Sequence, residues 1–494
     1  MSNKSIVLIS FVCGTLTFGP SLFAQTPANS APPAAVPTRP QLTPEQQATR
    51  KKAAEEEEAD HADMMRQLGI TTLRPGADSD QKSPHAANFD EAKVPPYSPP
   101  PDPLVFPDGK PVKTPRQWWT QRRPQIVKLL ESEIYGSIPA NVPTVTWSVA
   151  KTKDDTLGGT PAHILRLRGH VDNSIDPSIN VDIDVILALP ASAGKPVPVI
   201  AAFDFLPNDF GDAPARFPGL GARPKAGPRQ PSPREMVLAK GYGYAAISTN
   251  SIQADNSAGF TSGIIGLTNK GARRTPEQWG VLRAWAWGAS RLLDYLENNP
   301  AVDAKQVGTF GHSRYGKAAL VAMAFDQRFA IGYISSSGEG GAKLSRHDFG
   351  ERVENLTRVG GYHWMAGNFL KYGGPLTRND LPVDAHDLIA LCAPRPVFIS
   401  AGSPDAGDAW VDARGSFLSA VAAGGVYRLL GAKDLGTSAY PPMLTEIDPG
   451  EIAFRQHDQG HTPNPNWPYF LDFAQRELPK VKQLEASAGA TMSN

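Results

Sequence analysis

The run 311–317, Gly-His-Ser-Arg-Tyr-Gly-Lys, places a serine where nucleophilic chemistry could occur. An apolar, β-rich run at 307–310 precedes it and an Ala-rich run at 317–324 follows it, which predicts a strand, a tight turn and a helix. A serine on such a turn becomes a nucleophile when a base takes its proton and a carboxylate orients that base. Ser313 is therefore the predicted nucleophile. The second glycine, Gly316, stands three residues after it, whereas the usual turn has a glycine two residues after.

The carboxylate is expected after a strand that follows the nucleophile, because α/β-hydrolases keep the chain order serine, acid, histidine. The apolar run 396–401 predicts that strand, and Asp405, Asp408 and Asp412 all follow it at suitable distances. Position alone leaves these candidates open.

The base is expected in the loop before the last helix, which the pattern predicts over 467–478. His457 and His461 both lie in that loop. Other histidines fall in a predicted N-terminal arm or on predicted strands. His461 is the predicted base and His457 remains an alternative.

These residues need a scaffold, and the hydrophobic pattern predicts one. Three runs, 144–150, 163–171 and 181–189, alternate with period two, as antiparallel strands do. Later short apolar runs alternate with helical stretches, of which the clearest covers 275–298 with a capping box at its start. Strands alternating with helices predict an α/β-hydrolase three-layer sandwich: a mostly parallel central sheet with helices on both faces. The short runs are 197–205, 242–248, 306–310, 330–335 and 396–401.

The remaining chain divides by composition. A charged start, an apolar stretch and Ala24 before a plausible cleavage point predict a signal peptide over 1–24, and hence a secreted or periplasmic protein. We expect a Pro/Ala-rich tether, a helix at 44–68 and an extended arm over 25–110, the catalytic domain over 111–480, and a disordered tail over 481–494.

Charge and cysteine content exclude several classes of protein. Lys plus Arg and Asp plus Glu both number 49, so the formal net charge is zero and nothing favours nucleic acid as a partner. No later run is long and apolar enough for a membrane helix. Removal of the signal peptide leaves one cysteine, Cys392, and hence no intramolecular disulfide. No residue cluster has zinc spacing and no loop has a phosphate-binding pattern, so we expect no metal and no cofactor.

The run 311–317 resembles the nucleophile turn of the glucuronoyl esterases, carbohydrate esterase family 15, at every fixed position, including the displaced glycine. The resemblance extends from about residue 60 to about residue 478 and is to the bacterial branch. His312 stands where the fungal branch has a disulfide-forming cysteine. Other matching tracts are 61–70, 123–136, 285–288, 383–386, 393–396 and 427–431.

The resemblance also assigns roles. It selects Asp408 as the acid, since 408–415 resembles the family's Asp-x-Trp-x-Asp-x-Arg-Gly segment, and it selects His461 as the base. Many members carry a Glu 23 residues after the serine, but that position is Ser336 here, and Glu339, three residues further on, is a substitute shifted in register. It implies that Arg314 joins backbone N–H groups at the oxyanion. The residues implied to bind the sugar are Lys317, Glu351 and Trp410.

The resemblance implies a carboxylic ester hydrolase that acts as a monomer on glucuronate esters of glucuronoxylan, as in lignin–carbohydrate links. Two alternatives stay open at this point. One is an acetyl xylan or other carbohydrate esterase with the same triad. The other is an inactive hydrolase fold that binds carbohydrate, which the missing acid at Ser336 leaves possible.

Overall fold

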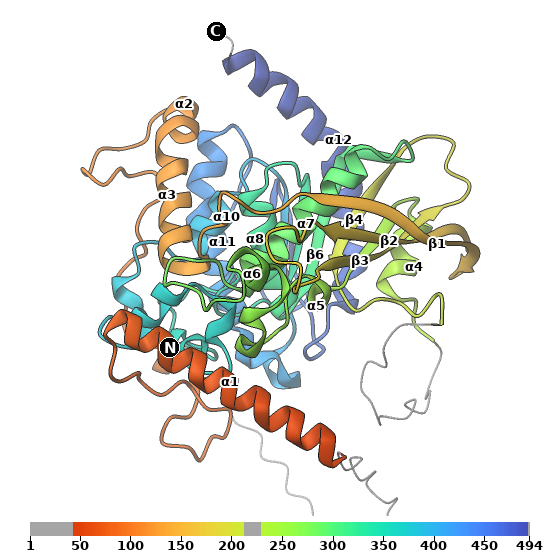
Figure 1. Ribbon diagram of the computed structural model, residues 1–494. Coiled ribbons are helices and arrows are strands. Elements are labelled where there is room, and N and C mark those ends of the chain that lie inside the picture. Colours follow the sequence, from red (N-terminus) through yellow and green to blue (C-terminus); the bar gives the residue numbers. More distant parts are fainter. Residues whose placement is uncertain (1–42, 212–228, 493–494) are drawn as a thin grey trace, which may run out of the picture.

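The computed structural model describes residues 43–211 and 229–492. The predicted signal peptide, residues 1–24, and the first part of the predicted tether, residues 25–42, lie outside the described residues. The described chain forms one ten-stranded sheet with helices packed on it (Figure 1).

The strand order across this sheet is β1-β2-β3-β5-β4-β6-β7-β8-β10-β9. The six strands from β5 to β10 in that order run parallel, while β1, β2, β3 and the edge strand β9 pair antiparallel with their neighbours. This arrangement confirms the predicted α/β class with a mostly parallel sheet. The strands are β1 (Val145–Leu157), β2 (Thr160–Val171), β3 (Asp182–Pro190), β4 (Val197–Phe203), β5 (Gly243–Ile247), β6 (Val302–His312), β7 (Ile331–Ser335), β8 (Val397–Ala401), β9 (Glu446–Ile447) and β10 (Ile452–Gln456).

Alternate residues of the central strands face opposite layers of the core. On β4, Val199 and Ala201 belong to the core layer that includes residues of α7, α8, α10 and α11, whereas Ile200 and Ala202 belong to the layer that includes residues of α4 and α12. The sheet is therefore covered on both faces, as its continuous apolar strands require. The main helices are α1 (Pro44–Leu68), α3 (Arg123–Leu129), α4 (Pro233–Ala239), α5 (Thr249–Ile252), α6 (Gly263–Thr268), α7 (Val281–Glu297), α8 (Arg314–Phe325), α9 (Val353–Thr357), α10 (Ala385–Ala390), α11 (Ala413–Leu429) and α12 (Trp467–Met492).

Two predicted boundaries differ from the structure. The helix predicted from residue 275 begins only at Val281, because the chain turns before it so that the N–H of Gly280 donates to the carbonyl of Tyr135 at 2.9 Å. At the C-terminus, α12 continues to Met492. The chain is thus helical through most of residues 481–494, which we expected to be a disordered tail.

An N-terminal arm follows α1 and runs along the catalytic domain (Figure 1). Arg74 fixes its start: the guanidinium donates to the carbonyls of Gly374, Tyr372 and Leu376 at 2.5–2.7 Å and to the carboxylate of Glu354 at 3.0 Å. Further along, the carbonyl of Asn88 accepts a hydrogen bond from Gly350, and the arm therefore contacts the loop that carries Glu351.

Replacement of Arg74 by alanine is expected to destabilise the protein by about 2 kcal/mol, because three partly buried carbonyls lose their donor. Thermal unfolding monitored by circular dichroism should show a midpoint lowered by a few degrees. Arg50 of α1 is exposed, and its replacement by alanine serves as the control that should leave the midpoint unchanged. An equal effect of both variants would contradict the anchoring role.

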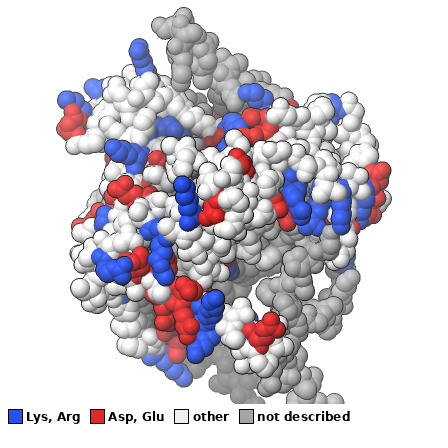
Figure 2. All heavy atoms as spheres, in the orientation of Figure 1, with Lys and Arg blue, Asp and Glu red and all other residues white. Residues whose placement is uncertain are grey.

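The surface reflects the balanced composition. Figure 2 shows acidic and basic side chains interspersed over the visible face. Within the described ranges, no helix combines the length and the apolar character that crossing a membrane requires.

Candidate active site

The predicted nucleophile lies at the junction of β6 and α8. Ser313 has φ 60° and ψ −130°, a conformation that costs a non-glycine residue about 1–3 kcal/mol and that clusters at active sites. Its N–H donates to the carbonyl of Ser335 on the neighbouring strand at 2.9 Å. The side chain is half-buried and lines a pocket.

The spacing of the two glycines has a steric cause. A Cβ atom at Gly311 would lie 1.9 Å from the carbonyl oxygen of Tyr315, and one at Gly316 would lie 2.8 Å from that of Ser335. The second glycine is thus needed three residues after Ser313, where α8 passes close to β7.

His461 and Asp408 meet at the same pocket. His461 Nδ1 lies 2.5 Å from Asp408 Oδ1, and the second oxygen of Asp408 accepts from the Ser336 hydroxyl at 2.8 Å and from the Gly402 N–H at 2.6 Å. Burial raises the pKa of Asp408, but these hydrogen bonds and the charge of His461 outweigh it and leave the pKa below its usual value. The buried carboxylate is therefore ionised and fixes the ring of His461.

Two neighbouring histidines are neutral. Both ring nitrogens of His457 bond to backbone groups: Nε2 donates to the carbonyl of Thr462 at 2.8 Å, and Nδ1 accepts from the N–H of Gln459 at 3.1 Å. The ring of His312 lies 4.3 Å from that of His461, and burial, followed by the charge of His461, lowers the pKa of His312 to about 3. The structure thus places His461, and not the alternative His457, against the carboxylate.

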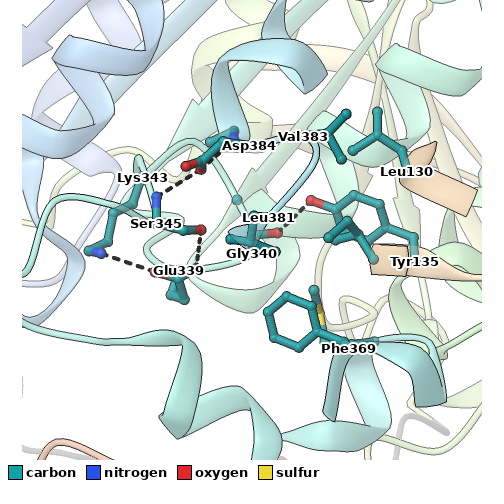
Figure 3. Close-up of a pocket in the computed structure, with 14 residues that line it drawn as sticks. Leu130, Tyr135, Glu339, Gly340, Lys343, Ser345, Phe369, Leu381, Val383 and Asp384 are labelled. Carbon is teal, nitrogen blue, oxygen red and sulfur yellow. Dashed lines mark hydrogen bonds and ion pairs between the residues drawn. The ribbon is translucent and has the colours of Figure 1, made fainter. Parts of the chain in front are cut away.

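The other candidate acids are engaged elsewhere. Asp412 bonds to His347 at 2.7 Å and caps α11 through the N–H of Gly415, while Asp405 is exposed. Glu339 is fully buried: Lys343 donates to its carboxylate at 3.0 Å and Ser345 donates to the other oxygen (Figure 3). Asp408 is the acid that faces His461.

Figure 3 shows that Glu339 belongs to a separate cluster with Lys343, Ser345 and Asp384, beside Tyr135 and Phe369. The cavity there holds about 20 Å³, roughly the space of one water molecule. Within this cluster the carboxylate of Glu339 supports the loop beneath the pocket.

The pocket at Ser313 has a volume of about 470 Å³. This volume suits a small ligand such as a sugar ring. All seven site residues predicted from the sequence line it: Ser313, Arg314, Lys317, Glu351, Asp408, Trp410 and His461. Within the described ranges, no group of three or more His, Cys, Asp or Glu residues has an arrangement that could hold a metal ion.

Lys317 and Glu351 form an ion pair of 3.0 Å in the wall of this pocket. Lys317 Nζ also donates to the carbonyl of Glu339 at 2.5 Å, and Glu351 accepts from the N–H of the same residue at 3.0 Å. Trp410 is half-buried, and its carbonyl accepts from the N–H of Glu351 at 2.8 Å. The wall thus offers two fixed charged groups beside an indole.

Arg314, at the first position of α8, also lines the pocket. Its side chain is 49% exposed and pairs with Asp255 at 2.6 Å. The N–H groups of the first turn of α8 also face this end of the helix, where the macrodipole favours negative charge. The arrangement can therefore stabilise an oxyanion next to Ser313.

Comparison with known proteins places the chain in a family. A family model described as glucuronyl esterase of fungi matches residues 274–431. A carbohydrate esterase from an unknown prokaryotic organism is 34% identical over 80% of this chain and 93% of its own length. The solved glucuronoyl esterase of Teredinibacter turnerae is 42% identical with a TM-score of 0.77, over 85% of this chain and 99% of that one. The chain belongs to carbohydrate esterase family 15.

Further glucuronoyl esterases agree with this assignment. The structure from Solibacter usitatus is 35% identical with a TM-score of 0.67, and covers 78% of this chain and 100% of that one. A 4-O-methyl-glucuronoyl methylesterase of Schizophyllum commune is 29% identical over 68% of this chain and 74% of its own length. The resemblance of the run 311–317 to this family is thereby confirmed.

Sequence reasoning missed several residues of this esterase pocket. Asp255, His363 and Trp364 line it near Arg314, and Ser336 and Ser337 line it near Asp408. Asp255 comes from a loop, whereas His363 and Trp364 come from the 3₁₀ helix Tyr362–Trp364 more than a hundred residues later, so no spacing connects them. Ser336 was noted only as the place of a missing acid, whereas its hydroxyl supports Asp408.

Proposed function

We propose that this protein is a serine esterase that hydrolyses esters of glucuronic acid, with or without a 4-O-methyl group, in glucuronoxylan, as in lignin–carbohydrate links. One observation carries the proposal: a serine on a strained turn shares a pocket with a carboxylate-bound histidine, an arginine and a Lys–Glu–Trp wall. The names of the relatives, glucuronoyl esterase and 4-O-methyl-glucuronoyl methylesterase, support the same substrate class.

The proposed reaction proceeds in two steps. His461 accepts the proton of Ser313 Oγ as this oxygen attacks the ester carbonyl, and the protonated ring then gives that proton to the departing alcohol. The glucuronoyl group remains bound to Ser313. His461 next removes a proton from water, which attacks the acyl carbonyl; the acyl–Ser313 bond then breaks, His461 returns the proton to Ser313 Oγ, and glucuronic acid is released. Asp408 holds the ring in one tautomer throughout.

The negative charge of each tetrahedral intermediate would develop beside the start of α8. Backbone N–H groups there and the guanidinium of Arg314 are the proposed donors. Their positions are set before substrate arrives, since Arg314 is held by Asp255.

The wall formed by Lys317, Glu351 and Trp410 is the proposed sugar site. Lys317 and Glu351 would bond to hydroxyl groups of the ring, and Trp410 would cover its apolar face. Both charged side chains are almost buried, at 4% and 11% exposure, so they keep one orientation. This wall favours a sugar-bearing acyl group over acetate.

Replacement of Trp410 by alanine is expected to raise KM for a methyl glucuronate ester about tenfold with little change in kcat, because stacking is lost from substrate and transition state alike. Trp119 is a half-buried tryptophan that does not line the pocket, and its alanine variant is the control. Steady-state kinetics measure both. A fall in kcat at unchanged KM would contradict the sugar-stacking role.

The direct test of function compares wild-type hydrolysis of methyl 4-O-methyl-glucuronate with hydrolysis of acetylated xylan. The proposal expects a clear preference for the glucuronate ester. Preference for the acetyl ester would instead favour an acetyl xylan esterase. Binding without any turnover would favour an inactive carbohydrate-binding protein.

We also propose that the enzyme is secreted or periplasmic and acts as a monomer. The apolar stretch before Ala24 and the polymeric substrate support export.

A further inference from the structure

Asp255 occupies a junction at the edge of the pocket, in the loop between α5 and the 3₁₀ turn Ser257–Thr261. One oxygen, Oδ2, accepts from Arg314 Nη1 at 2.6 Å. The other, Oδ1, accepts from Trp364 Nε1 at 2.7 Å and lies 3.1 Å from His363 Nε2. The carboxylate is only 18% exposed, and both of its oxygens are in use.

His363 and Trp364 hold this carboxylate in place. The Nδ1 atom of His363 is buried and has no hydrogen-bond partner among the described residues, so the contact of Nε2 with Asp255 is the polar contact that its ring makes there. Burial raises the pKa of Asp255, but His363, Trp364 and Arg314 together hold it below the usual value. Asp255 is therefore an ionised, oriented anchor for a guanidinium that is itself half-exposed.

The charges lining the pocket occur as pairs. Lys317 pairs with Glu351, and Arg314 pairs with Asp255. With Asp408, the pocket holds two cations and three carboxylates, so it carries no excess of positive charge while its imidazoles are neutral.

This balance matters because the proposed reaction changes the charge of its substrate. A neutral ester and water give an alcohol and a carboxylic acid, which ionises near neutral pH and leaves a carboxylate beside Arg314. An unpaired arginine binds a carboxylate strongly, often through two parallel hydrogen bonds. Arg314 already has a carboxylate partner in Asp255.

We propose that Asp255 is a positioning residue that holds the Arg314 guanidinium at the pocket and, by offsetting its charge, weakens retention of the carboxylate product. The inference rests on the proposed function for the identity of that product. Its effects on the first step oppose one another: Asp255 orients Arg314 but also repels the developing oxyanion. Asp255 orients Arg314 for product binding as well, but the product carries a full negative charge, so the repulsion by Asp255 outweighs the orienting effect there.

The test measures the inhibition constant of free glucuronate and kcat/KM for its methyl ester. Asp255→Asn is expected to lower the inhibition constant about tenfold, because a nearby like charge is removed, while kcat/KM changes only a few-fold. Asp255→Glu keeps the charge and should keep the wild-type inhibition constant. In Asp255→Asn/Arg314→Ala the gain in product binding should vanish, since Asp255 acts through Arg314.

Asp326→Asn is the matched control. Asp326 also forms an ion pair with an arginine, Arg328, at 2.7 Å, with 15% exposure, but at the opposite end of α8, about 18 Å away for a helix of 12 residues. This variant should change neither constant. A merely structural role of Asp255 predicts lower kcat/KM without tighter product binding.

An inhibition constant for Asp255→Asn that is unchanged or higher overturns the inference. Calorimetric binding of glucuronate to each variant in a Ser313→Ala background gives the same answer if a variant loses turnover. If the wild type binds glucuronate but hydrolyses no glucuronate ester, the proposed function fails, and the calorimetric comparison still decides whether Asp255 weakens carboxylate binding.

Discussion

Replacement of Ser313 by alanine is expected to lower kcat for a glucuronate ester by about 10⁴-fold or more, because no acyl-enzyme can form. The residual rate would come from the oxyanion donors and from substrate binding, both of which the variant retains. The fold should be unaffected, since the side chain of Ser313 caps nothing in α8 and alanine keeps the same backbone conformation with the same Cβ atom. Initial rates with methyl 4-O-methyl-glucuronate measure the effect.

Ser337 provides the matched control. It is also a serine that lines the pocket, but its hydroxyl is used structurally, as the acceptor for the N–H of Ala342 at 2.9 Å. Ser337→Ala should therefore retain most of the activity, with a lower unfolding temperature. Mass spectrometry after treatment with a fluorophosphonate should find the adduct on Ser313. Labelling of another serine, or clear turnover by Ser313→Ala, would contradict the assignment.

The nucleophile turn could be predicted because its requirements are local. The motif lies within about twenty residues: a β-rich run, two glycines and an Ala-rich run. At each glycine a side chain would clash, with the turn itself at Gly311 and with the neighbouring strand at Gly316. The parallel sheet could also be predicted from the sequence, since its buried strands are short apolar runs between helices. The displaced position of Gly316 showed only that the turn was unusual. Its cause, the approach of the Ser335 carbonyl, needed the structure.

The start of α7 shows how a valid local signal can mislead. Thr275 and Gln278 do form the side-chain hydrogen bond expected of a helix start. However, the amide of Gln278 also bonds to Asn269, and the chain then turns so that the N–H of Gly280 reaches the carbonyl of Tyr135. The helix begins only after this tertiary contact.

The Arg314 side of the pocket could not be predicted from the sequence. Asp255 lies in a loop, and His363 lies 108 residues later in the 3₁₀ helix Tyr362–Trp364. Their contact depends on how these two segments pack around Arg314. Spacing rules describe helices, strands and tight turns, and they do not extend to such contacts.

Position in the chain reduced the candidates for the triad acid to a few residues but did not select one of them. Replacement of the acid, Asp408, is expected to have the second largest effect on activity. Asp408→Ala should lower kcat/KM by about 10³- to 10⁴-fold, because His461 loses the partner that fixes its tautomer and stabilises its protonated form. Asp405 lies on the same loop and is exposed, so Asp405→Ala should keep wild-type activity. Near-full activity of Asp408→Ala would show that another acid serves His461.

A second-site change tests the geometry behind this prediction. Ser336 occupies the position where many family members carry a glutamate, and here its hydroxyl lies 2.8 Å from Asp408 Oδ2. A carboxylate introduced at this position, once Asp408 is shortened, would therefore enter the space next to His461. The double variant Asp408→Ala/Ser336→Glu is expected to recover about tenfold or more of the lost kcat/KM. Ser336→Gln in the same background matches the glutamate in size without its charge and should recover little. Equal recovery by both would mean that filling the space, and not the negative charge, restores the histidine.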